Sequence, residues 1–164
     1  RVLTQAQGES APSQDEAAAV RAPDPIEARG GGVRVTLTPA DCFVIDRFSS
    51  IRFQVTADPG VVVLEAHVIF NTAFGDASWM ATDASKTGGG AVDAAEYEGI
   101  LPKPLLEATA ISYRVFVKTS QGSVMTEVLV GGLSPSEEGC ALVGGRAAAA
   151  GSPRGLIDVY RWKR

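Results

Sequence analysis

The chain has 164 residues, a length that allows one hydrophobic core but is short for two domains. Its 15 Lys and Arg face 19 Asp and Glu, which leaves a net charge of -4 and no basic stripe, so nucleic acid is not an expected partner. No apolar run approaches the roughly 20 residues that span a bilayer. Because the sequence starts at Arg1 rather than at Met or at an apolar leader, we expect a processed mature form or an excised fragment.

Residues 1–32 are interpreted as an N-terminal arm or linker. They are rich in Ala, Gln, Glu and Pro and end in a triplet of glycines, a composition that cannot bury enough apolar surface to fold alone. Ser13, followed by Glu16 and an alanine run, resembles a capping box. Both a short helix and a flexible leader are compatible with this stretch.

The residues that follow carry repeated strand signals. Short runs rich in Val, Ile, Phe and Thr alternate with clusters of Gly, Pro and Asp, which are typical of strands and of the turns between them. The expected strands are, in chain order, residues 33–38, 51–57, 61–72, 78–82 and 96–101, followed by two strands within residues 111–130. No helical period of useful length competes with them.

Residues 111–130 predict an antiparallel hairpin that turns at Gly122. Apolar and polar residues alternate before and after this glycine, the period expected when one face of a strand is buried. After the turn, one face is formed by Val124, Thr126, Val128 and Val130. The predicted core of the whole fold consists of Phe53, Val55, Leu64, Val68, Phe70, Tyr113, Val115 and Val117.

Seven short strands joined by turns predict an all-β fold, a single antiparallel seven-stranded sandwich. The expected sandwich spans residues 33–131. Residues 132–164 are then a C-terminal tail with a possible terminal strand.

The two cysteines, Cys42 and Cys140, lie far apart in the sequence. Neither belongs to a Cys-x-x-Cys motif or to a Cys/His cluster, so their spacing does not indicate a zinc or haem site. By themselves they are compatible with two unrelated buried thiols or with a disulfide formed in an oxidising compartment.

Residues 33–130 resemble a bacterial extracellular immunoglobulin-like or fibronectin type III-like domain. The matching features are IRFQV as strand B, VVVLEAHVIF as strand C, Trp79 in the short strand that follows, and Leu-Pro ahead of ISYRVFV at the crossover into strand F. The resemblance implies a tyrosine corner, in which Tyr113 has a buried ring and a hydroxyl bonded to nearby backbone. The spacing between the Leu-Pro pair and Tyr113 is longer than the family pattern.

The resemblance also bears on the cysteines. In that topology the first and last strands end at the same end of the sandwich, and Cys42 follows the first strand while Cys140 follows the last. The resemblance therefore implies a Cys42–Cys140 disulfide and, with it, an extracellular or cell-surface location, periplasmic or secreted.

No catalytic or metal-binding constellation is evident. The only histidine, His67, is expected on the solvent-facing side of its strand beside Glu65, without a third ligand for a metal ion. No Gly-x-Ser-x-Gly elbow accompanies it, and the glycine triplets lack the residues of a phosphate loop. We therefore predict no enzymatic activity, no catalytic residues, no metal and no cofactor.

Trp79 is open to two interpretations. An exposed ring on an edge strand would stack a carbohydrate, whereas a tryptophan of a small sandwich more often fills the core.

The C-terminal tail carries the main functional hypothesis. Residues 155–164 crowd β-branched and aromatic residues into a strand-like segment that has no partner left in a completed sandwich. The candidate assembly residues are Ile157, Val159, Tyr160 and Trp162. If this arm adds as a strand to the sheet of another copy, the chain is a self-assembling extracellular subunit of a surface filament or fibre.

The second hypothesis is an accessory module of a larger secreted or envelope protein. Its partners would be other cell-surface proteins or glycans, and it rests on fold analogy and on the commonness of such modules.

Overall fold

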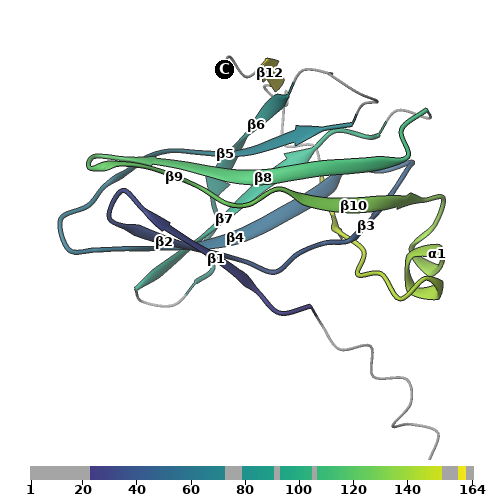
Figure 1. Ribbon diagram of the computed structural model, residues 1–164, viewed down its shortest axis with the longest axis horizontal. Helices are drawn as coiled ribbons and strands as arrows, with labels where there is room; N and C mark the ends of the chain where they lie inside the picture. Colours follow the sequence, from purple (N-terminus) through teal and green to yellow (C-terminus); the bar gives the residue numbers. More distant parts are fainter. Residues whose placement is uncertain (1–22, 73–78, 91–92, 105–106, 153–158, 162–164) are drawn as a thin grey trace, which may run out of the picture.

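The computed structural model describes residues 23–72, 79–90, 93–104, 107–152 and 159–161, the last of these for the backbone alone. Strands dominate these residues, which confirms the all-β class, and they form two layers that face each other across a shared core (Figure 1). Across these ranges, no helix is long and apolar enough to cross a membrane.

Twelve strands and one short helix are present in the described part of the chain. The elements are β1 (Ile26–Gly30), β2 (Val33–Leu37), β3 (Cys42–Val44), β4 (Ser49–Ala57), β5 (Val63–Asn71), β6 (Met80–Lys86), β7 (Ala94–Leu101), β8 (Ala110–Thr119), β9 (Gly122–Met125), β10 (Leu129–Ser134), α1 (Glu137–Leu142), β11 (Ala149–Ala150) and β12 (Val159–Arg161).

One layer contains β1, β2, β4 and β7, and the other contains β5, β8, β10 and β3. Strand β6 belongs to both layers, because residues 80–83 pair with β5 and residues 84–86 pair with β7. The strands therefore form one curled sheet in the order β1-β2-β4-β7-β6-β5-β8-β10-β3, with β9, β11 and β12 attached to β8, β4 and β6.

The expected seven-stranded antiparallel sandwich is wrong in strand number and in strand direction. The sheet path has nine strands, and β3 pairs with β10 in parallel, with Cys42 opposite Gly132. Strand β3 forms because the chain leaves β2 after Leu37 and crosses to the opposite layer, where Phe43 enters the core. A strand of three residues carries too little periodicity to be predicted from the sequence.

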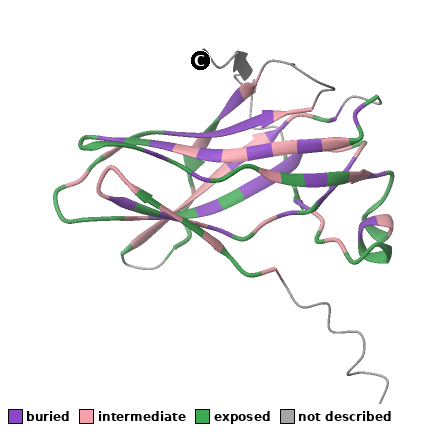
Figure 2. Cartoon of the chain, in the orientation of Figure 1, coloured by how far each residue is buried: buried purple, intermediate pink, exposed green. Residues whose placement is uncertain are grey.

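The core is built from alternate residues of the facing strands, and buried positions alternate with more exposed ones along β4 and β8 (Figure 2). Seven of the eight predicted core residues are at most 3% exposed, and Leu64 is the exception at 57%. The pairing of β5 with β8 shifts register between Val63 and Glu65. This irregularity leaves Leu64 facing outward. From Ala66 to Phe70 every residue is buried, so the expected alternation is absent from this part of β5.

The glycine triplet near the N-terminus is a hairpin turn and not a linker. Strands β1 and β2 pair up to Gly30 opposite Val33, so Gly31 and Gly32 alone connect them. A tight two-residue hairpin of this kind requires a positive φ at both turn positions, and the φ angles of Gly31 and Gly32 are 58° and 74°. The expected arm of residues 1–32 thus contributes a strand to the sheet.

The predicted hairpin is present, since β8 pairs antiparallel with β9 across a two-residue turn. The expected face holds for Val124 and Thr126, which are both buried, and ends after Thr126. The Thr126 hydroxyl accepts the Val115 N–H at 2.9 Å and so takes the position of a ladder carbonyl. In β10, Leu129 packs on the core and Val130 is 61% exposed, which is the reverse of the predicted alternation.

The expected boundary after residue 131 falls inside β10, so part of the predicted tail belongs to the sheet. Helix α1 follows, and its N-cap Ser136 accepts the Gly139 N–H at 3.0 Å. Two acidic residues, Glu137 and Glu138, occupy the first turn, where the helix dipole favours negative charge.

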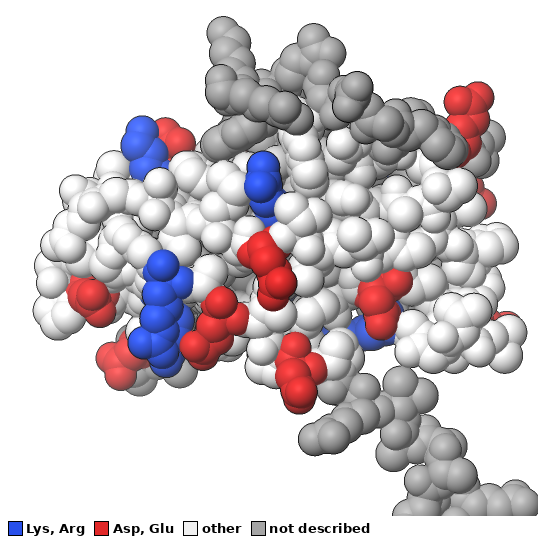
Figure 3. All heavy atoms as spheres, in the orientation of Figure 1, with Lys and Arg blue, Asp and Glu red and all other residues white. Residues whose placement is uncertain are grey.

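Charged side chains of both signs are scattered over the face shown in Figure 3, and no extended basic patch lies on it. Several of them pair, as Arg52 does with Glu98 at 3.2 Å.

Candidate assembly site at the C-terminal segment

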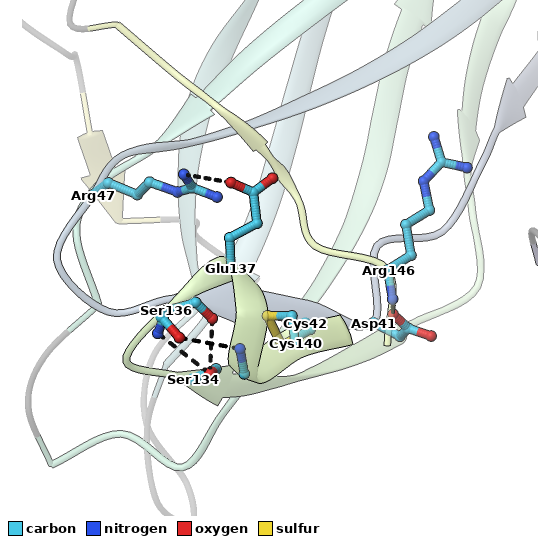
Figure 4. Close-up of a disulfide and its surroundings, with 9 residues drawn as sticks. Asp41, Cys42, Arg47, Ser134, Ser136, Glu137, Cys140 and Arg146 are labelled. Atoms are coloured by element: carbon cyan, nitrogen blue, oxygen red, sulfur yellow. Dashed lines mark hydrogen bonds and ion pairs between the residues drawn. A yellow bond between two sulfur atoms is a disulfide. The ribbon is translucent and has the colours of Figure 1, made fainter. Parts of the chain in front are cut away.

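Cys42 and Cys140 form a disulfide at one end of the two layers, which confirms the expected pairing. Their Cα atoms are 5.6 Å apart, and both residues are buried. Because Cys42 begins β3 and Cys140 lies in α1, the bond fastens the helix to the strand at the end of the sheet path (Figure 4). The bond is consistent with a non-cytoplasmic location.

Cys42 also holds the extended chain that follows α1. Its N–H donates to the Arg146 carbonyl at 3.1 Å, and its own carbonyl accepts the Ala148 N–H at 2.8 Å. The Arg146 N–H donates to the Asp41 carboxylate. A single residue therefore anchors both the helix, through its sulfur, and the C-terminal segment, through its backbone.

The C-terminal segment then fills a vacant stretch of β4. Strand β7 pairs along one whole edge of β4, whereas β2 occupies the other edge only from Phe53 onward. Strand β11 pairs with Ser49 and Ser50 at the start of that edge, and the Gly151 N–H donates to the Phe48 carbonyl at 3.0 Å. The segment thus links β3 to β4 and closes the curled sheet at this end.

Tyr113 explains why β2 leaves the β4 edge. Its ring is fully buried, and its hydroxyl donates to the Ala40 carbonyl at 2.8 Å and accepts the Ala40 N–H at 2.7 Å. The N–H and the carbonyl of Ala40 are therefore both bonded to Tyr113 in the opposite layer and do not pair with β4. Pro39, the residue before it, has no N–H to donate. This differs from a tyrosine corner, because Ala40 lies 73 residues upstream of Tyr113 rather than a few.

Burial raises the pKa of Tyr113 to about 12; the hydrogen bond with Ala40 opposes this increase and the nearby Asp41 carboxylate adds to it. The folded state therefore favours the protonated phenol more than the unfolded state does. Its contribution to stability is complete below pH 10 and is lost as the pH rises from 10 through about 12.

We expect the free energy of unfolding to fall by on the order of 2 kcal/mol between pH 10 and pH 12 because of this group. Urea titrations across that range measure it, and Tyr113→Phe is the matched control. The variant is less stable at pH 8, since Ala40 loses its partner, but its stability should decline less steeply above pH 10. Equal slopes for the two proteins would contradict the prediction.

Strand β12 pairs antiparallel with β6, with Val159 opposite Thr82 and Arg161 opposite Met80. Strand β7 leaves this part of the β6 edge vacant, because its pairing with β6 begins only at Ala84. The C-terminal strand therefore has a partner in its own chain, which corrects the expectation that none is left. Like β11, it occupies an edge that a longer strand has left.

Two of the four candidate assembly residues, Val159 and Tyr160, lie in β12. The other two, Ile157 and Trp162, lie outside the described residues.

The prediction that His67 faces the solvent is wrong, because its side chain is only 6% exposed. Its ring stacks on Phe116 with centroids 6.2 Å apart, its Nδ1 lies 2.9 Å from Asp83, and its Nε2 lies 3.4 Å from Glu65. The two carboxylates contact different ring nitrogens and do not converge with the imidazole on one point, as metal ligands must. Among the described residues, no group of three or more His, Cys, Asp or Glu is placed to hold a metal ion.

Trp79 is partly buried, and the Arg114 guanidinium lies over its ring at 4.8 Å from the centroid. Such a cation–π contact covers ring surface that a stacked sugar would need.

A groove of about 470 Å³ opens beside β4 where β2 and β11 diverge. Its lining includes Thr36, Ser50, Arg52 and Glu96. Because charges of both signs line the groove and Arg52 is already paired with Glu98, the groove has no chemistry that selects one class of ligand.

Sequence reasoning does not identify Ala40, Arg146 or Ala148, because each of them acts through backbone groups that every residue type except proline carries. The only local signal is Pro39, which marks the point where β2 must end. For α1, the serine ahead of two glutamates was an available capping signal.

Comparison with known proteins finds no matching family model, no matching curated protein and no matching solved structure.

Proposed function

We propose that the chain is a non-enzymatic structural domain of a secreted or cell-surface protein and that it self-associates by exchanging its C-terminal strand. An immunoglobulin-like or fibronectin type III-like relationship is part of this proposal. It is supported by the neighbours in each layer, β2-β4-β7 in one and β6-β5-β8-β10 in the other, which resemble the sheets of such domains. The buried disulfide supports a location outside the cytoplasm.

The observation that carries the proposal is the pairing of β12 with the β6 edge. Among the described residues, three pairs hold this strand, and they join it to a stretch of β6 that β7 leaves open. Because strand addition uses backbone groups that are identical in every copy, β12 of a neighbour can make the same pairs. An edge strand of this kind is a ready template for another chain.

The alternative of an accessory or carbohydrate-binding module rests on the resemblance and on Trp79. The Arg114 guanidinium lies over that ring, which weakens the hypothesis that Trp79 binds a carbohydrate. The residues that line the groove beside β4 do not favour one class of ligand. Strand exchange has a defined donor and a defined acceptor, and for this reason we rank it first.

Deletion of residues 155–164 tests the proposal. We expect the truncated chain to keep its β-sheet circular dichroism, because the disulfide and β11 lie before the deletion. We expect its self-association to weaken or disappear, because the donor strand is gone. Light scattering coupled to size-exclusion chromatography over a concentration series measures this.

Deletion of residues 1–22 is the matched control, since it removes an arm but leaves β12 and β6 intact. Association of the C-terminally truncated chain at the level of the intact one would show that β12 is not the connector. An intact chain that stays monomeric at every concentration would overturn self-assembly and leave the accessory module.

A further inference from the structure

We infer that the exchange of β12 is reciprocal and closes on two copies of the chain, rather than running on as an open filament. This inference rests on the exchange proposed above and adds its partner arrangement. It follows from where the donor strand leaves the body and where the acceptor edge lies.

The donor strand β12 is tethered to the body at β11, which pairs with the first residues of β4. We call this point of attachment the donor root. The last anchored pair of the C-terminal segment is Ala150 opposite Ser49, and the Gly151 N–H is bonded to Phe48. On the other side of β4, Ser49 lies opposite Leu101, the last residue of β7. The root of the donor is therefore level with the end of β7.

The acceptor edge lies at the same end. Strands β6 and β7 are antiparallel with Ala84 opposite Gly99, so two further steps of this register place Thr82 level with Leu101. The pairs with β12 begin at Thr82 and run outward to Met80. Strands β11, β4, β7 and β6 are neighbours in that order, so three strand spacings put the donor root about 15 Å from the acceptor edge.

The anchors of the root limit the part that can be exchanged. The Cys42–Cys140 bond, the backbone bonds of Cys42 and the β11 pairs all act before residue 152. The eight residues between Ala150 and Val159 span at most about 28 Å when fully extended. A partner must therefore present its acceptor edge close to the donor root.

The short chain between β11 and β12 and the nearby acceptor edge of β6 are both accommodated when two copies pack against each other through the end that carries β11 and β12. Each copy gives its β12 and receives the β12 of the other, and the contact is the same patch on both sides, as in a two-fold interface. No donor and no acceptor is left over, so the assembly stops at two. An open filament would need the donor root and the acceptor edge on different sides of the body.

A disulfide trap at one register pair distinguishes the arrangements. Met80 and Arg161 are opposite each other in the β6–β12 pairing, and the native cysteines are already joined to each other. We would prepare the double variant Met80→Cys with Arg161→Cys, oxidise it mildly over a concentration series, and separate the products under denaturing, non-reducing conditions.

We expect an internally linked monomer and a covalent dimer, with the dimer fraction rising with concentration and no larger species. A ladder of trimers and longer products would overturn the closed arrangement while preserving strand exchange. Linked monomer alone at every concentration would overturn the exchange as well. The two ideas therefore fail in different ways.

Two controls keep the result interpretable. A mixture of the two single variants should give a heterodimer that neither variant gives alone, because only the pairing in trans brings the new cysteines together. Light scattering of the unmodified chain should level off at twice the 17.1 kDa mass of one copy, which checks the conclusion without any substitution. A mass that keeps rising with concentration would contradict the closed dimer.

Discussion

Removing the Cys42–Cys140 disulfide should lower the free energy of unfolding by up to about 4.7 kcal/mol in the chain-entropy model. The bond closes a loop with a sequence separation of 98, and its loss restores that conformational freedom to the unfolded chain. The paired substitution of both cysteines by Ala is the suitable change, because it leaves no buried hydroxyl and no reactive thiol. Chemical denaturation at neutral pH measures the difference.

Reduction of the unmodified protein is the matched control and should give a similar loss. The folded state should also lose local order, because Cys42 anchors the C-terminal segment. Amide exchange at Ala148 and Gly151 should therefore increase more than exchange in β8. Two titratable thiols in the unfolded, unreduced protein would contradict the disulfide itself.

Replacing Phe43 with Ala should cost about 3–5 kcal/mol of stability. Phe43 is fully buried, and its ring meets that of Tyr113 edge to face with centroids 5.6 Å apart. The Phe43 ring lies directly against Gly131 of the neighbouring strand β10, where an added Cβ would clash with the ring. The substitution removes this packing and leaves a cavity that the neighbouring strands cannot fill.

Val128→Ala is the matched control, because Val128 is 45% exposed and its truncation should change the free energy of unfolding by about 0.5 kcal/mol or less. Equal effects of the two substitutions would show that Phe43 does not belong to the core. Urea denaturation of both variants with the disulfide intact makes the comparison.

The sequence alone determined the long strands and which of their faces is buried. Phe53 and Val55 in β4, and Val115 and Val117 in β8, are buried as the period of two predicts, because side chains of an extended chain alternate between the two faces whatever the strand pairs with. The hairpin turn that ends at Gly122 was also predictable from a local signal, because Gly122 has a positive φ, which favours glycine.

Local patterns failed where pairing between strands overrides alternation. Leu64 turns outward at a register shift, and the face after Thr126 reverses because a side-chain hydroxyl accepts a ladder hydrogen bond. His67 is buried on a face predicted to be wet, because Phe116 and Asp83 are brought to it by other strands. Each of these outcomes depends on a partner that is distant in the sequence.

Only the tertiary structure decided what the C-terminal segment does. Strands β3, β11 and β12 have two or three residues each, too few for a period to be recognised. Their positions depend on edges left vacant elsewhere, on β4 because Tyr113 draws Ala40 away and on β6 because β7 pairs with it only from Ala84 onward. A vacant edge consists of backbone N–H and C=O groups, which every residue type except proline carries, so a pattern of side chains does not reveal it.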